Sequence, residues 1–114
     1  MKLMTKALEK LLEKNPLYSH EDDAMEDVKV LAKFFCGPAT WYVTEGSFEY
    51  DDYVFFGLVH IMDNEPELGY FSLSEIEDLK VGPFGLTAER DMYFEPCKHT
   101  LKEALEAERS GRCL

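Results

Sequence analysis

Lys and Arg are absent from residues 34–79, a stretch that contains ten acidic side chains. The flanking segments 1–33 and 80–114 carry nearly balanced charge, so the central stretch accounts for almost the whole net charge of −11. A negative field of this kind repels nucleic acids and anionic membranes and attracts basic surfaces. The charge pattern therefore predicts no direct binding to nucleic acid or to a membrane, and a partner with a basic protein surface.

Long apolar runs are also missing. No run approaches the roughly 18 apolar residues that a membrane helix needs. The N-terminal sequence MKLMTKALEKLLEK interleaves Lys and Glu, so it lacks the apolar stretch of a signal peptide. We therefore expect a cytoplasmic protein. Its 114 residues, of which 46% are hydrophobic, predict one folded domain over residues 1–114, either as a monomer or as a homodimer.

Cysteine is scarce, and motifs for cofactors are absent. The three cysteines show no C-x-x-C spacing, which argues against a disulfide scaffold and a paired zinc motif. Cys97 and His99 form only an isolated C-x-H, and DNEPE at 63–67 lacks the Gly and the distal Glu of a calcium loop. Phosphate-binding glycine patterns and a G-x-S-x-G elbow do not occur. We therefore expect no metal and no cofactor.

Apolar periodicity predicts a helix at each end of the chain. Apolar residues recur at helical spacing before Pro16, which predicts an amphipathic helix over residues 5–14 with Thr5 as its cap. Thr100 and Glu103 form a capping box that predicts the start of the last helix.

Between these helices the sequence predicts strands and polar loops. The segment 53–62 is almost continuously apolar, which is typical of an interior strand covered on both faces. SHEDDAMED at 19–27 and GSFEYDD at 46–52 are predicted to be loops. The other strands are predicted at 28–35, 40–45, 68–72 and 89–96. The prediction is an α+β fold, in which an antiparallel meander of four or five strands carries the N-terminal and C-terminal helices on one face.

The stretch ELGYFSLSEIEDL at 67–79 contains two overlapping helix-start signals, one at Ser72 and one at Ser74. A cap at Ser72 pairs Phe71 with Ile76 in a hydrophobic staple, whereas a cap at Ser74 pairs Leu73 with an acid. We therefore predict that Ser72 caps this helix. The acids that follow are then explained by the helix dipole, which favours negative charge in the first turn.

Trp41 and Tyr42 are neighbours in a predicted strand, so they point to opposite faces of the sheet. We expect one of them in the core and the other exposed, where Tyr42 would anchor a partner. His60 lies within an apolar strand and is interpreted as a core or edge histidine rather than a general base.

Glu89, Arg90 and Asp91 form a charged trio late in the sequence. The trio suits a cleft in which a guanidinium shifts the pKa values of neighbouring carboxylates. It equally suits an ion-pair network at the start of a strand. Both interpretations stay open.

A set of short segments, in the same order along nearly the whole chain, resembles the bacterial domain-of-unknown-function family DUF2958: KFF, WYVTEG, FFGLV, ELGYFSLSEIE and GLTAERDMYFEP. The resemblance implies a small single-domain protein, often encoded on plasmids and other mobile elements, with no assigned reaction or cofactor. The chain departs from the family at GLTAERD, where the family tends to have Pro and an apolar residue before the acid. The resemblance implies a shared site at Trp41, Glu45, Glu67, Glu89, Arg90 and Asp91.

The sequence is compatible with two alternative functions. The first is a non-enzymatic acidic binding module, acting as an inhibitor or regulator encoded on a mobile element; one version mimics DNA. The second is a small hydrolase or lyase that uses Glu45, Glu67, Glu89 and Asp91 as acid and base, with Arg90 binding an anion. An acidic surface that only keeps the protein soluble explains the same charges. The partner surface of the first function is predicted at Trp41, Tyr42, Glu45, Glu49, Asp51, Asp52 and Glu67.

Overall fold

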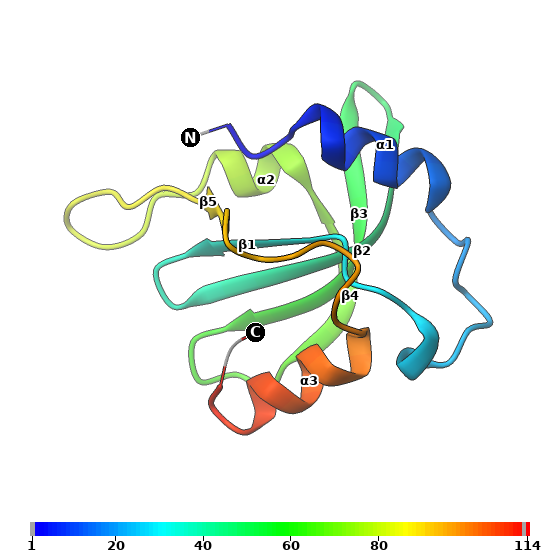
Figure 1. Ribbon diagram of the computed structural model, residues 1–114. Helices are drawn as coiled ribbons and strands as arrows, with labels where there is room; N and C mark the ends of the chain where they lie inside the picture. Colours follow the sequence, from blue (N-terminus) through cyan, green and yellow to red (C-terminus); the bar gives the residue numbers. More distant parts are fainter. Residues whose placement is uncertain (1, 113) are drawn as a thin grey trace.

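Five strands form one open antiparallel sheet in the computed structural model, which describes residues 2–112 and 114 (Figure 1). The order across the sheet is β4-β3-β2-β1-β5, so the first four strands are a meander and β5 adds to the outer edge of β1. The elements are α1 (Lys6–Lys14), the 3₁₀-helix η1 (Met25–Asp27), β1 (Ala32–Cys36), β2 (Ala39–Glu49), β3 (Asp52–Ile61), β4 (Glu67–Ser72), α2 (Leu73–Glu77), β5 (Glu89–Arg90) and α3 (Leu101–Arg109).

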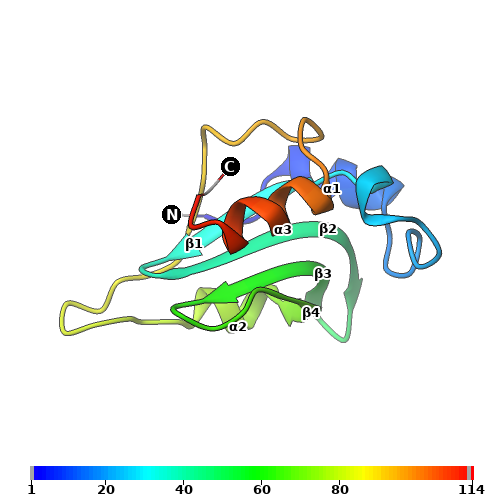
Figure 2. The same ribbon diagram turned by 90° about the horizontal axis from the view of Figure 1, so that it is seen from below.

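Each face of the sheet buries its own hydrophobic cluster. Trp41 and Tyr42 belong to different clusters, because successive side chains of a strand point to opposite faces. On the Trp41 face, Leu12 of α1 and Ile76 of α2 join the cluster. On the Tyr42 face, Ala104 of α3 joins the other cluster. Figure 2 shows α3 and α2 on opposite sides of the sheet.

The predicted α+β class and antiparallel sheet are confirmed, but the terminal helices do not share a face as expected. The helix α1 packs with α2 on the Trp41 face, whereas α3 covers the Tyr42 face. The apolar sequence of β3 gives the physical reason. Its side chains are apolar on both sides of the sheet, so each face needs a cover, and one helix from each end of the chain supplies it.

The predicted helix start at Ser72 is confirmed. The Ser72 hydroxyl accepts a hydrogen bond from the backbone N–H of Glu75 at 3.2 Å. Phe71 and Ile76 are both buried in one cluster, as the staple requires. The caps predicted at Thr5 and Thr100 are present as well.

Two predicted strands are shorter in the structure. The strand predicted from residue 28 begins at Ala32, because the backbone before it bonds to the segment leading into α3. The Val30 N–H donates to the His99 carbonyl, and the Val30 carbonyl accepts from the Cys97 N–H, both at 2.9 Å. Of the strand predicted at 89–96, only Glu89–Arg90 pairs with β1.

The predicted loop at 46–52 is mostly strand. The strand β2 continues to Glu49 and β3 begins at Asp52, so only Tyr50 and Asp51 form the turn. Both turn residues have positive φ, as the tight hairpin turns that match strand twist require.

Candidate functional site

A β-bulge at Thr44 interrupts the ladder between β2 and β3. The register shifts between Val43 and Glu45, and the Thr44 hydroxyl donates a hydrogen bond to the carbonyl of Phe56 at 3.0 Å. A bulge adds one residue to a strand and re-aims the side chains around it. As a result, the consecutive residues Thr44 and Glu45 line the same pocket.

Gly57 allows the two strands to approach closely beside this bulge. Gly57 is the register partner of Val43, and a Cβ atom added at Gly57 would lie 1.8 Å from the carbonyl oxygen of Tyr42. No side chain fits at that distance from a backbone atom, so the local backbone geometry around the bulge depends on glycine at this position.

The carboxylate of Glu45 is buried and holds the loop 15–23 against β2. Its Oε1 accepts a hydrogen bond from the Tyr18 N–H at 3.1 Å, and its Oε2 accepts one from the His20 N–H at 2.7 Å. The Leu17 N–H also donates to the Ser47 hydroxyl at 3.0 Å. One acidic side chain therefore satisfies two backbone donors of a loop that precedes it by more than twenty residues.

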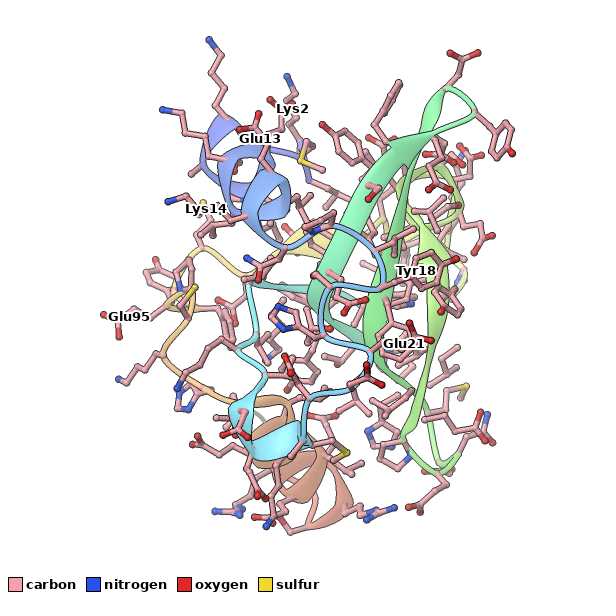
Figure 3. All side chains as sticks on the ribbon, turned by 90° about the vertical axis from the view of Figure 1, so that its right-hand side faces the viewer. Lys2, Glu13, Lys14, Tyr18, Glu21 and Glu95 are labelled. Carbon is pink, nitrogen blue, oxygen red and sulfur yellow. The ribbon has the colours of Figure 1, made fainter. Side chains whose placement is uncertain are left out.

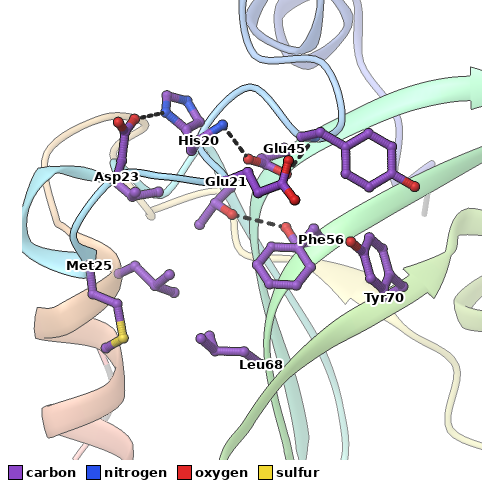
Figure 4. A pocket seen from close by; sticks show the side chains of 12 residues that line it. His20, Glu21, Asp23, Met25, Glu45, Phe56, Leu68 and Tyr70 are labelled. Atoms are coloured by element: carbon purple, nitrogen blue, oxygen red, sulfur yellow. Dashed lines mark hydrogen bonds and ion pairs between the residues drawn. The ribbon is translucent and has the colours of Figure 1, made fainter.

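The imidazole of His20 stiffens the same loop. Its Nδ1 lies 2.8 Å from Oδ2 of Asp23, and its Nε2 lies 2.6 Å from Oδ1 of Asn15. The Asn15 carbonyl accepts a hydrogen bond from the Gly46 N–H at 3.1 Å. The start and the end of the loop are thus joined to each other through His20, and the loop is joined to β2. Figure 4 shows the contacts of His20 with Asp23 and with Glu45.

The loop and three strands enclose a pocket of about 190 Å³ (Figure 4). Aromatic side chains form its rim: the ring centroids of Tyr18 and Tyr70 are 6.2 Å apart, and those of Phe56 and Tyr70 are 5.0 Å apart. Tyr18 and Tyr70 are each more than half exposed. The pocket is lined by Tyr18, His20, Glu21, Asp23, Met25, Val28, Thr44, Glu45, Phe56, Leu68, Tyr70 and Leu101.

The pocket is electrically negative. Glu21, Asp23 and Glu45 line it, and no Lys or Arg is found among its described lining residues. Desolvation raises the pKa of Tyr70, and Tyr18, Glu45 and Glu21 add to the increase because they disfavour a phenolate nearby. Figure 3 shows Tyr18 and Glu21 over the strands, away from Lys2 and Lys14 at the α1 end.

The structure corrects three of the predicted partner residues. Trp41 and Tyr42 are both buried, so the expectation that one would be exposed is wrong, and Tyr42 is not an exposed anchor. Each face of the sheet is covered by a helix, which is why neither aromatic side chain reaches solvent. Glu45 is also buried and belongs to the pocket rather than to an exposed acidic edge.

Of the remaining predicted partner residues, three lie together at the β2–β3 turn, and Glu67 lies away from them at the start of β4. Glu49 and Asp51 are exposed at the β2–β3 turn, and Glu67 is exposed at the start of the edge strand β4. Asp52 is half-buried, and its carboxylate accepts hydrogen bonds from the backbone N–H and the hydroxyl of Ser74 at the start of α2. These hydrogen bonds lower the pKa of Asp52.

The carboxylates proposed for acid and base chemistry do not converge. Glu67 is on β4 and Glu89 is on β5, which are opposite edges of the sheet, while Glu45 lines the pocket described above. Arg90 and Asp91 line a second cavity of about 100 Å³. The Nζ of Lys33, which lines that cavity too, is 3.6 Å from the Asp91 carboxylate.

A buried polar cluster on the α3 side of the sheet was missed by the sequence reasoning. The Tyr42 hydroxyl donates to Oε2 of Glu108 at 2.8 Å, and Nδ1 of His60 lies 2.7 Å from Oε1 of the same carboxylate. Helical spacing could have found it, because Glu108 follows Leu101 and Ala104 on the buried stripe of α3. A charged residue on an apolar stripe needs a partner from the core.

In the part of the chain that the structure describes, no group of three or more His, Cys, Asp or Glu side chains is arranged to hold a metal ion. None of the described helices has the length and apolar character of a membrane span.

The fold and the site define a class: a small α+β protein with an antiparallel meander and an acidic pocket rimmed by aromatic residues. The model of the family described as "Protein of unknown function (DUF2958)" matches residues 3–114, and the chain belongs to this family, as the resemblance of its segments predicts. No curated protein and no solved structure matches the chain significantly.

Proposed function

We propose that the protein is a non-enzymatic binding module that engages a basic surface of another protein through the pocket between the loop 15–23 and the sheet. The observation that carries the proposal is the combination of three carboxylates and three aromatic side chains around one cavity whose described lining has no Lys or Arg. Exposed aromatic residues supply contact area, and the unbalanced negative charge supplies attraction for a basic partner.

The acidic pocket is a better candidate for the partner surface than the hairpin turn. Glu49 and Asp51 lie on an exposed turn beside the exposed Tyr50. The pocket is concave, and its loop is fixed by Glu45 and His20. A surface that is ordered before binding loses less conformational entropy when the partner arrives.

The alternative function, a carboxylate-dependent hydrolase or lyase, has less support. It needs Glu45, Glu67, Glu89 and Asp91 to meet in one cleft. Three of them line three different cavities, and Glu89 lies on the edge strand β5. General acid–base catalysis needs both groups within hydrogen-bond reach of one substrate.

The test is affinity capture at low and high salt with charge-matched variants. The pocket variant carries Glu21→Gln and Asp23→Asn, and the control carries Glu75→Gln and Glu77→Gln on α2, where both side chains are exposed. Both variants lose the same charge. We expect a basic protein that the wild type and the control retain at low salt, that the pocket variant loses, and that high salt releases.

If both variants lose the captured protein equally, binding depends only on net charge, and the pocket is not the binding surface. If the captured protein binds nucleic acid, competition with DNA for that protein tests the version in which the module mimics DNA.

A further inference from the structure

We infer that the pocket is a receptor site for a single arginine side chain presented by the partner. This inference rests on the proposed function and names the chemical group that the pocket recognises. It is carried by the size of the cavity, by its aromatic rim and by the unused hydrogen-bonding capacity of Glu45.

The cavity volume limits the ligand. At about 190 Å³ the pocket is smaller than the roughly 300–1,000 Å³ typical of sites for drug-sized molecules and cofactors. A nucleotide or a dinucleotide is therefore too large to be enclosed. One long side chain, entering from the aromatic rim, matches the dimensions better.

The aromatic rim favours a cation with a flat face. Tyr70 is tilted against both Tyr18 and Phe56, with interplanar angles of 56° and 59°, so the three rings do not stack flat on one another. A guanidinium stacks on such faces through cation–π attraction and planar contact. An ammonium group has no flat face and is more strongly hydrated, so it gains less from this rim.

The carboxylate of Glu45 lines the pocket beside Tyr18 and His20 and offers acceptors to the guanidinium. An ionised carboxylate has about four acceptor positions, and the backbone N–H groups of Tyr18 and His20 use one on each oxygen. One acceptor position on each oxygen therefore remains for two parallel N–H donors, the pattern in which a guanidinium binds a carboxylate. The two backbone hydrogen bonds also fix the carboxylate, so its orientation costs little entropy on binding.

The rest of the lining suits the alkyl part of an arginine. Val28, Leu68 and Leu101 line the pocket with apolar surface, against which the methylene groups of a long side chain can pack. Glu21 lines the same pocket, adding negative charge near the guanidinium.

The experiment is an NMR titration of the ¹⁵N-labelled protein with three blocked amino acids: N-acetyl-arginine amide, N-acetyl-lysine amide and N-acetyl-citrulline amide. Citrulline has nearly the shape of arginine but no charge. We expect arginine to shift the backbone amide signals of residues 18–21, 44–46 and 68–70, with at least about tenfold weaker binding of citrulline, since a charge-assisted bidentate pair is lost. Lysine should bind at least about threefold more weakly than arginine, because planar stacking is lost.

Two variants separate the contributions of the rim and the charge. Tyr70→Leu keeps an apolar side chain but removes a ring, and Glu21→Gln removes one carboxylate; each should weaken arginine binding about threefold. Glu75→Gln on α2 is the control and should leave it unchanged. The amide spectrum of each variant reports on folding independently of binding.

Equal binding of lysine and arginine, or arginine shifts that map outside the pocket, would overturn the inference. If arginine shifts nothing while the pocket variant still loses its salt-sensitive partner, the inference fails and the proposed function stands. If the pocket variant captures partners as the wild type does but arginine still binds in the pocket, the site is real and the proposed function fails.

Discussion

The Glu45 carboxylate accepts a hydrogen bond from the backbone N–H of His20 at 2.7 Å, across 25 positions of sequence. This contact joins the bulge of β2 to a loop that the sequence alone describes only as polar. The pocket forms because the bulge points Glu45 inward, where the backbone N–H groups of the loop donate hydrogen bonds to its carboxylate.

Changing Glu45 to Gln should destabilise the fold and loosen the loop. The amide group of Gln offers one acceptor oxygen in place of two, so one part-buried backbone N–H loses its partner, at a cost of about 1 kcal/mol. Urea unfolding measures the free energy, and hydrogen exchange at Tyr18 and His20 measures the loosening. Glu49→Gln, an exposed change on the same strand, should stay within about 0.5 kcal/mol. Equal stability of the two variants would show that Glu45 does not anchor the loop.

Changing Gly57 to Ala should be among the most damaging single substitutions. The new methyl group meets the carbonyl oxygen of Tyr42 at a distance no real contact allows, so the strands must separate, and we expect a loss of about 3 kcal/mol or more. Gly69 is paired with Gly57 on β4 and has open space around its position. Gly69→Ala is therefore the matched control, with an expected change below about 1 kcal/mol. Thermal unfolding of both variants makes the comparison, which fails if the two melt alike.

Asp52 should stabilise the protein in a pH-dependent way. Hydrogen bonds from Ser74 lower its pKa below the ordinary value of 3.8, so its contribution is present above that value and is lost as the pH falls through the folded-state pKa. Asp52→Asn should therefore cost about 0.5 kcal/mol at pH 7, a small effect because solvent screens the site, and progressively less towards pH 3. Unfolding curves at several pH values measure the difference. A loss that is the same at pH 7 and at pH 3 would contradict this prediction.

Glu108 should couple α3 to the sheet. Replacing it with Ala removes the acceptor for the Tyr42 hydroxyl and the partner of His60, with an expected cost of about 3 kcal/mol. Glu106→Ala, on the exposed side of the same helix, should change stability little. In a double-mutant cycle with Tyr42→Phe, the double variant should lose about 1 kcal/mol less stability than the sum of the two single losses. Full additivity would mean that the hydroxyl and the carboxylate act independently.

Cys36 and Cys97 should differ in reactivity. Burial raises the pKa of the Cys36 thiol, and its Sγ donates to the Leu86 carbonyl, so little thiolate is available to react. Cys97 is exposed. Alkylation of the native protein, followed by mass spectrometry of its peptides, should label Cys97 and reach Cys36 only after unfolding. Labelling of Cys36 at a comparable rate in the native state would contradict the described packing.

Local signals in the sequence predicted the parts of the fold that depend on neighbouring residues. The cap at Ser72 was predictable because only that choice pairs Phe71 with Ile76. The meander was predictable because short polar turns separate apolar segments. The assignment of both terminal helices to one face failed, since the same apolar stripe can pack against either side of a sheet whose two faces are both apolar.

The sequence by itself determined the charge distribution, the caps, the α+β class and the family. Only the tertiary structure decided the site. Glu45 looked like one member of an exposed acidic run, and a bulge at Thr44 turned it inward to meet the backbone of Tyr18 and His20. Such a contact has no local signature, because it depends on the register of two strands and on the path of a loop that is close in space and distant in sequence.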